Sequence, residues 1–257
     1  SRIRDEARLL GLLRHRNIVD VIDLTSIDGR TAVVMEYLEA VDLRFLTASL
    51  KEAGHLLPVR VALEIVTQVS SALDAAYNRP PMAGDKPLRV IHRDIKPSNI
   101  MLDKHGVAKV LDFGVAQSEI ESREANTQEL QFGSVEYMAP ERLFFEPETP
   151  ASDVYSMGAT LFEILAQERV GKARGRPDKH AAHLADRLSF MRSRITVSGA
   201  VAKELESLIR QSLDFEHEKR PTAAEFNQRA KALARVAADE DLVSWAEIEL
   251  PPIIEVA

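Results

Sequence analysis

The chain has 257 residues, of which 45% are hydrophobic and 28% charged, and its 40 Asp and Glu residues outnumber its 33 Lys and Arg residues. This composition excludes a disordered chain and supplies enough apolar residues for one large domain or two lobes. The acidic balance argues against a nucleic-acid partner, and the lack of cysteine excludes disulfides and thiolate metal sites. The longest apolar stretch, 155–166, is too short for a membrane helix, so we expect a cytoplasmic protein without a membrane segment.

The first eighty residues combine helical and β-rich patterns. Leucines at helical spacing predict a helix that ends before residue 15, and the β-rich runs 18–24 and 31–37 flank Asp28 and Gly29, which predict a hairpin turn. Apolar side chains then recur at helical spacing after Pro58, a residue type favoured in the first turn of a helix. Residues 58–78 are therefore predicted to form a long helix.

The rest of the chain is mainly helical in pattern. Two short β-like segments flank a predicted tight turn at 103–106, and residues 153–166 are apolar nearly all round, as in a buried helix. A capping box of Thr222 and Glu225 predicts a helix that reaches about residue 238. The last segment, 245–257, contains Pro251 and Pro252, and we expect it to be extended and to pack on the helical part or to begin a linker.

Three polar motifs in the middle of the chain have residue types that suit phosphate chemistry. Residues 92–99 read His-Arg-Asp-Ile-Lys-Pro-Ser-Asn, residues 112–114 read Asp-Phe-Gly, and residues 139–141 read Ala-Pro-Glu. Asp94, Asn99 and Asp112 supply the oxygen ligands that Mg²⁺ prefers beside phosphates, and Lys96 can place a positive charge over a transferring phosphoryl group. A lone Asp-Phe-Gly is usually only a turn, but here the three motifs occur together in a specific order.

With these motifs the chain resembles a eukaryotic-type (Hanks-type) protein serine/threonine kinase domain, of the kind also found in bacteria. The resemblance implies an α+β, protein-kinase-like fold with a truncated β-rich N-lobe and a complete, mainly helical C-lobe. It implies a partial N-lobe with helix C and two strands at 1–37, the hinge and C-lobe at 38–238, and a C-terminal tail or linker at 239–257.

The resemblance assigns roles to the residues of the first two motifs. Asp94 would orient the substrate hydroxyl and take its proton, and Lys96 would neutralise charge on the γ-phosphoryl group of ATP. Asn99 and Asp112 would hold two Mg²⁺ ions. The implied cofactors are therefore ATP and Mg²⁺, and the implied partner is a protein that presents Ser or Thr.

The resemblance also implies an adenine pocket at the end of the second β-rich run. Met35 would be the gatekeeper, the backbone of Glu36 and Leu38 would bond adenine, and Met101 would lie under the ring. Glu6 occupies the position of the Glu that pairs with the ATP-binding Lys. The sequence contains neither that Lys nor a Gly-rich loop before Glu6, so we expect a fragment with little kinase activity of its own.

Further roles implied by the resemblance are structural. Asp153 would anchor a stacked apolar spine, and Glu141 would form a buried salt bridge with Arg220. The members of the spine would be Leu10, Val21, His92 and Phe113.

Two local features bear on substrate and regulation. Lys96, two residues after Asp94, is typical of Ser/Thr kinases rather than Tyr kinases. Arg93 indicates regulation by phosphorylation within 115–132, with Thr127 as the first candidate, followed by Ser122 and Ser118, although a plain exposed loop explains the same residues.

Residues 168–194 hold eight basic and three acidic side chains and could dock an acidic substrate or partner, although a solvated helix face is the simpler interpretation. A surface metal site at His180, His183 and Asp186 is a remote alternative.

Two other functions remain open. A pseudokinase or scaffold would use the helical lobe for binding, but it would not need the complete set of Asp94, Lys96, Asn99 and Asp112. A kinase of small molecules is disfavoured by Glu141, because such relatives lack the peptide-positioning segment.

Overall fold

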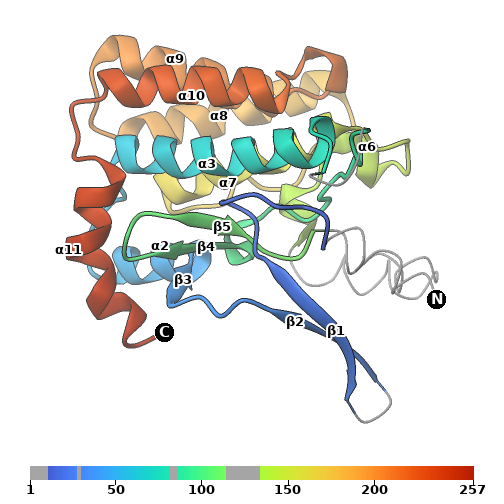
Figure 1. The fold of residues 1–257 in the computed structure, drawn as a ribbon. Helices are drawn as coiled ribbons and strands as arrows, with labels where there is room; N and C mark the ends of the chain where they lie inside the picture. Colours follow the sequence, from blue (N-terminus) through green and yellow to red (C-terminus); the bar gives the residue numbers. More distant parts are fainter. Residues whose placement is uncertain (1–10, 28–29, 82–85, 114–133) are drawn as a thin grey trace.

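The computed structural model describes residues 11–27, 30–81, 86–113 and 134–257. It consists of a body of packed helices with a small sheet on one side, and a two-stranded hairpin that extends away from this body (Figure 1). The strands are β1 (Val21–Ile27), β2 (Arg30–Met35), β3 (Ala40–Asp42), β4 (Ile100–Asp103) and β5 (Ala108–Val110). The longer helices are α2 (Leu43–Glu52), α3 (Val59–Asn78), α7 (Pro150–Ala166), α8 (Pro177–Arg194), α9 (Gly199–Ser212), α10 (Ala223–Val236) and α11 (Leu242–Ile254). The short helices are η1 (Pro97–Asn99), η2 (Ser134–Tyr137), α6 (Pro140–Leu143) and η3 (His217–Lys219).

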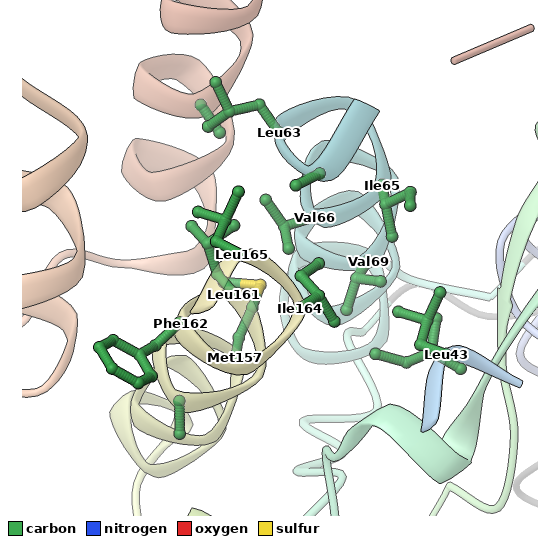
Figure 2. Close-up of a cluster of buried hydrophobic side chains, with 14 of the residues drawn as sticks. Leu43, Leu63, Ile65, Val66, Val69, Met157, Leu161, Phe162, Ile164 and Leu165 are labelled. Carbon is green, nitrogen blue, oxygen red and sulfur yellow. The ribbon is translucent and has the colours of Figure 1, made fainter. Parts of the chain in front are cut away.

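The core lies between α3 and α7, with α10 packed along α3 and α9 against α7. In Figure 2, Val66 of α3 and Leu165 of α7 point toward one another, and each labelled residue is at most 1% exposed. Burying one Leu or Ile side chain stabilises a fold by about 1.5–3 kcal/mol, so this cluster holds the body together. The labelled residues are Leu43, Leu63, Ile65, Val66, Val69, Met157, Leu161, Phe162, Ile164 and Leu165.

Gly158 permits the close approach of α7 and α9. A Cβ atom added at this position would lie 2.7 Å from Cβ of Ser212, a separation that real Cβ contacts do not reach. The buried pattern predicted for 153–166 is confirmed, because α7 is buried almost throughout its length.

Two antiparallel sheets flank the body. The first sheet has the strand order β3-β4-β5, and the predicted turn connects β4 to β5. The second sheet consists of β1 paired with β2. A parallel bridge between Ile18 and Val110 joins the chain before β1 to β5, with N–H of Val19 donating to the carbonyl of Val110 at 3.0 Å. The hairpin is thereby attached at its base, while its far end projects from the body (Figure 1).

Most of the predicted elements are present. The long helix after Pro58 is α3, and the capping box of Thr222 and Glu225 begins α10. The predicted first helix lies largely outside the described residues, and Asp28 and Gly29 do as well. No helix in the described ranges is both long and apolar enough to cross a membrane.

The prediction of an extended C-terminal segment is wrong, because residues 242–254 form α11 despite Pro251 and Pro252. Asp241 caps the helix, and Leu242, Trp245 and Leu250 are buried. The apolar face at helical spacing outweighs the prolines, which lie in the last turn, so most of the helix forms before them and keeps its hydrogen bonds.

Helix α11 packs across one end of α3 and the β4–β5 turn (Figure 1). The N–H of Leu242 donates to Oε2 of Glu64 at 2.8 Å, and the backbone N–H of Arg60 donates to Asp239 at 3.3 Å. Gly106 in the turn has φ of +71°, and a Cβ there would lie 3.2 Å from the side chain of Leu242.

Candidate active site

The loop that carries the first motif is anchored to helix α7. The backbone N–H groups of His92 and Arg93 donate to the two carboxylate oxygens of Asp153, each at 2.7 Å. Burial raises the pKa of Asp153 to about 6, although these two hydrogen bonds act in the opposite direction. The predicted anchoring role of Asp153 is confirmed by this geometry.

The buried His92 ring connects the first motif to the second. Its Nε2 lies 2.7 Å from the carbonyl oxygen of Leu111, and its Nδ1 accepts from the N–H of Asp94 at 3.2 Å. Since a carbonyl can only accept, the hydrogen is assigned to Nε2 and the ring is neutral. Burial lowers the pKa of His92 to about 4, in agreement with a neutral ring.

Two members of the predicted spine are in contact. The rings of His92 and Phe113 meet edge to face, with their centroids 4.5 Å apart. Val21 and Phe113 line the same cavity of about 50 Å³, while Leu10 lies outside the described residues.

Asp94, Lys96 and Asn99 form a compact hydrogen-bonded group. Lys96 Nζ donates to Asp94 Oδ2 at 2.6 Å, and Asn99 Nδ2 donates to the same oxygen at 2.8 Å and to the backbone carbonyl of Asp94 at 2.8 Å. Asn99 is 8% exposed and belongs to η1, which begins at Pro97, a residue type favoured in a first helical turn. The local fold of the loop thus holds one oxygen of the Asp94 carboxylate from two sides.

Asp112 lies close to this group. The N–H of Leu111 donates to the carbonyl of Asn99 at 2.9 Å, which joins the two motifs through the backbone. Asp112 has φ of +55°, a left-handed conformation that few non-glycine residues adopt. Desolvation raises the pKa of Asp112, the nearby charge of Asp94 raises it further, and Lys96 acts in the opposite direction. A cation beside these carboxylates would relieve this repulsion.

The predicted adenine-binding residues lie along the end of β2 and on β4. Met35 is 40% exposed and lines the cavity of about 50 Å³ together with Asp112 and Phe113. Glu36 and Leu38 follow β2 in irregular backbone, and the N–H of Glu36 donates to Asp20 at 3.0 Å. Met101 lies on β4 and is partly buried. Glu6, Ser118, Ser122 and Thr127 lie outside the described residues.

The predicted salt bridge between Glu141 and Arg220 is confirmed. Arg220 donates to the two oxygens of Glu141 at 2.7 and 2.8 Å, and the side chains are 0% and 3% exposed. Ser152 donates to Oε1 of Glu141 at 2.7 Å. This bidentate pair ties α6 to the chain that precedes α10.

Three polar contacts next to the site were not predicted from the sequence. Glu148 forms ion pairs with Arg93 at 2.9 Å and with Arg142 at 3.1 Å. The hydroxyl of Tyr137 donates to Glu163 at 2.5 Å. None of the three pairs has a local spacing signal, because each joins residues of different segments of the fold.

The basic segment 168–194 uses several of its arginines for internal contacts. Arg169 pairs with Glu136 at 2.5 Å, and Arg187 donates to the carbonyl of Arg169 at 2.6 Å while it lies over the ring of Phe162. A cavity of about 570 Å³ lies between this segment, α2 and η2. Docking of an acidic partner there stays a prediction.

The remote alternative of a histidine metal site has no support in the described residues. The ring nitrogens of His180 and His183 bond separate backbone carbonyls, at 2.8 Å each. Within residues 11–27, 30–81, 86–113 and 134–257, no group of three or more His, Cys, Asp or Glu side chains is arranged to hold a metal.

The chain is similar to known bacterial protein kinases. It is 35% identical over 232 residues to the tyrosine-protein kinase MasK of Myxococcus xanthus, a match that covers 87% of this chain and 34% of MasK. It is 38% identical over 165 residues to the serine/threonine-protein kinase PrkC of Bacillus subtilis, which covers 64% of this chain and 23% of PrkC. The chain therefore spans about a third or less of the curated relatives that it matches.

The architecture has a counterpart among solved structures. The crystal structure of the Mycobacterium tuberculosis PknI kinase domain aligns with a TM-score of 0.62 over 90% of this chain and 77% of that one, at 23% identity. At this identity the likeness shows the fold alone. The family model of the protein kinase domain matches residues 1–230. The chain therefore belongs to the protein kinase family, and its small antiparallel sheets and helical body form an α+β, protein-kinase-like fold.

Proposed function

We propose that the protein transfers the γ-phosphoryl group of ATP to a Ser or Thr hydroxyl of a protein substrate. The observation that carries the proposal is the group formed by Asp94, Lys96 and Asn99, in which one carboxylate oxygen is held by two donors at 2.6 and 2.8 Å. The proposed partners are ATP and a substrate protein, and the proposed location is the cytoplasm, where ATP is available.

Asp94 is the proposed catalytic residue. Its carboxylate orients the substrate hydroxyl, whose oxygen forms a bond to the γ-phosphorus while the bond from that phosphorus to the β,γ-bridging oxygen breaks and ADP leaves. The hydroxyl proton passes to Asp94 late in this loose transition state. Lys96, which is bonded to Asp94 at 2.6 Å, places its charge beside the phosphoryl oxygens as they become more negative.

Asn99 and Asp112 fit a Mg²⁺ site that phosphate oxygens would complete. The side-chain nitrogen of Asn99 is used on Asp94, which leaves its amide oxygen as the atom that could bind a cation. The raised pKa of Asp112 reflects desolvation and the nearby charge of Asp94, which a cation would offset. The protein kinase family uses ATP and Mg²⁺, and two ions are proposed here; bound Mg²⁺ neutralises charge on the phosphates.

Two observations support specificity for Ser and Thr: the spacing of Asp94 and Lys96, and the similarity to relatives such as the serine/threonine-protein kinase PrkC. The relative MasK, in contrast, is named a tyrosine-protein kinase. Tyr specificity is therefore the second candidate. Acid hydrolysis of the phosphorylated substrate, followed by separation of phosphoserine, phosphothreonine and phosphotyrosine, decides between the two.

The direct test is Asp94→Asn in the full-length protein. Loss of a positioned general base lowers the rate by about a hundredfold or more, so incorporation of labelled phosphate into a generic substrate should fall by that factor. The matched control is Asp186→Asn, the same chemical change on the exposed face of α8. A wild-type protein that binds ATP or a partner without transferring phosphate would overturn the proposal and favour the scaffold.

A further inference from the structure

The residue immediately before Asp94 has an unfavourable backbone conformation. Arg93 has φ of +75°, in the left-handed region where L-residues with a Cβ are strained. Such a conformation persists only where surrounding contacts determine it. The conformation of Arg93 therefore requires stabilising contacts, and it sets the direction in which the chain presents Asp94.

The backbone groups of Arg93 are bonded on both sides. Its N–H donates to Asp153 at 2.7 Å, and its carbonyl accepts a hydrogen bond from Nη1 of Arg142. Asp153 belongs to the buried helix α7, whereas Arg142 belongs to the short helix α6. Holding the Arg93 carbonyl therefore depends on what holds the side chain of Arg142.

Glu148 connects the two arginines. Its Oε2 lies 2.9 Å from Nε of Arg93, and its Oε1 lies 3.1 Å from Nε of Arg142. The Arg142 and Glu148 side chains are only 12% and 23% exposed, so water screens this contact less than it screens a surface pair. The three residues form a closed ring around the Arg93 peptide, with one carboxylate between two guanidinium groups.

Glu148 supplies a carboxylate that the guanidinium groups of Arg93 and Arg142 share. Both guanidinium groups lie against Glu148, whereas Asp153 accepts the backbone N–H of Arg93. The two oxygens of Asp153 are occupied by the backbone N–H groups of His92 and Arg93, so Asp153 acts on the loop and Glu148 on the arginine side chains. Neutralising Glu148 would remove the negative charge that the side chains of Arg142 and Arg93 share.

We propose that Glu148 is a positioning residue for phosphoryl transfer. It holds the side chains of Arg93 and Arg142, and through Arg142 the strained Arg93 peptide, so that the Asp94 carboxylate keeps its orientation. Glu148 does not touch the reacting atoms, and the inference rests on the proposed function. The sequence did not predict this role for Glu148. Glu146 lies in the same irregular segment, and it is Glu148 that contacts Arg93.

The test compares Glu148→Gln with Glu146→Gln in the full-length protein. Glu146 is exposed and lies two residues away, so the control makes the same chemical change outside the ring. We expect Glu148→Gln to lower kcat about tenfold, as loss of a charge-assisted contact does, with KM for ATP within about twofold of wild type. Circular dichroism and ATP titration at the assay temperature establish that each variant is folded.

A double-mutant cycle separates positioning from general destabilisation. If Glu148 acts through Arg142, the two fold-losses in kcat do not multiply. The variant with both Glu148→Gln and Arg142→Gln then has the same kcat as the less active of the two single variants. Multiplicative losses, or a Glu148→Gln kcat within about twofold of wild type, would overturn the inference alone. An inactive wild-type protein would instead overturn the proposed function on which it rests.

Discussion

The helical body buries most of its large apolar side chains, whereas the β1–β2 hairpin leaves several of them exposed to solvent. In the body, Leu161 and Phe162 are completely buried, whereas in the hairpin Ile22 and Ile27 are 67% and 60% exposed. Among the described residues, the hairpin meets the body near its base (Figure 1). The helices of the body therefore form a hydrophobic core with one another. The strands of the hairpin are held by their backbone pairing and bury few of their side chains.

The largest expected effect concerns the buried ion pair of the body. Glu141→Gln leaves the charge of Arg220 without its partner, and removal of one member of a buried pair costs about 3–5 kcal/mol. Urea unfolding at pH 7 measures the loss. The control is Glu206→Gln, which removes a surface pair with Arg210 within α9 and should cost less than about 0.5 kcal/mol. Equal losses in the two variants would mean that Glu141 and Arg220 are hydrated in solution.

A matched pair of truncations tests the comparison most directly. Leu161→Ala in α7 should lower the free energy of unfolding by about 3 kcal/mol, because it removes buried methyl groups and leaves a cavity. Ile22→Ala in β1 should change it by less than about 0.5 kcal/mol, because the side chain is 67% exposed. If the two variants lose similar amounts of unfolding free energy in the same assay, the side chain of Ile22 is buried in solution.

The buried His92 should make the body sensitive to acid. The pKa of His92 is about 4 in the folded chain and 6.5 in the unfolded chain. As pH falls below 6.5, the unfolded chain therefore binds a proton that the folded chain does not bind, and the folded state loses stability. Between pH 6.5 and 5 the wild type should lose about 1.6 kcal/mol relative to His92→Phe. The raised pKa of Asp153 acts in the opposite direction, but it is present in both proteins and largely cancels in the difference.

Urea unfolding of the two proteins at several pH values measures this difference. The charged groups that act on His92 are Asp94, which raises its pKa, and Lys96 and Arg142, which lower it. A difference that does not change with pH would show that His92 has the same pKa in the folded and the unfolded chain.

The smallest effect concerns the close contact of α7 and α9. Gly158→Ala places a methyl group 2.7 Å from Cβ of Ser212, and overpacking of this kind costs about 1–3 kcal/mol, of which about 1 kcal/mol is offset because Ala favours a helix. The control is Gly199→Ala at the start of α9, where a Cβ would meet nothing within 4 Å. Unchanged thermal unfolding of Gly158→Ala would mean that the two helices can move apart without cost.

Residues that are close in sequence were the easiest to predict. Asp94, Lys96 and Asn99 lie within one short loop, so their motif implies their contact directly. The ion pair of Glu141 and Arg220, 79 positions apart, was predictable only through the resemblance to a kinase, because no local rule links the two segments.

Contacts that depend on tertiary packing were missed. Glu148 meets Arg93 only because α6 and the loop before Asp94 are brought together, and nothing in its sequence neighbourhood distinguishes it from Glu146. The two prolines of α11 favoured an extended segment, yet they lie beyond Trp245 in the last turns of the helix. Their missing N–H groups free the carbonyls of exposed residues 247 and 248, which water can satisfy.

Helix α11 has a consequence for how the chain can be divided. The family match ends at residue 230, but the folded unit continues through Ile254, because Leu242, Trp245 and Leu250 belong to the same core as α3. A protease-resistant fragment should therefore include residues 242–254. A chain shortened to the family boundary would uncover an apolar strip along α3 and around Gly106, and such a strip favours association between molecules.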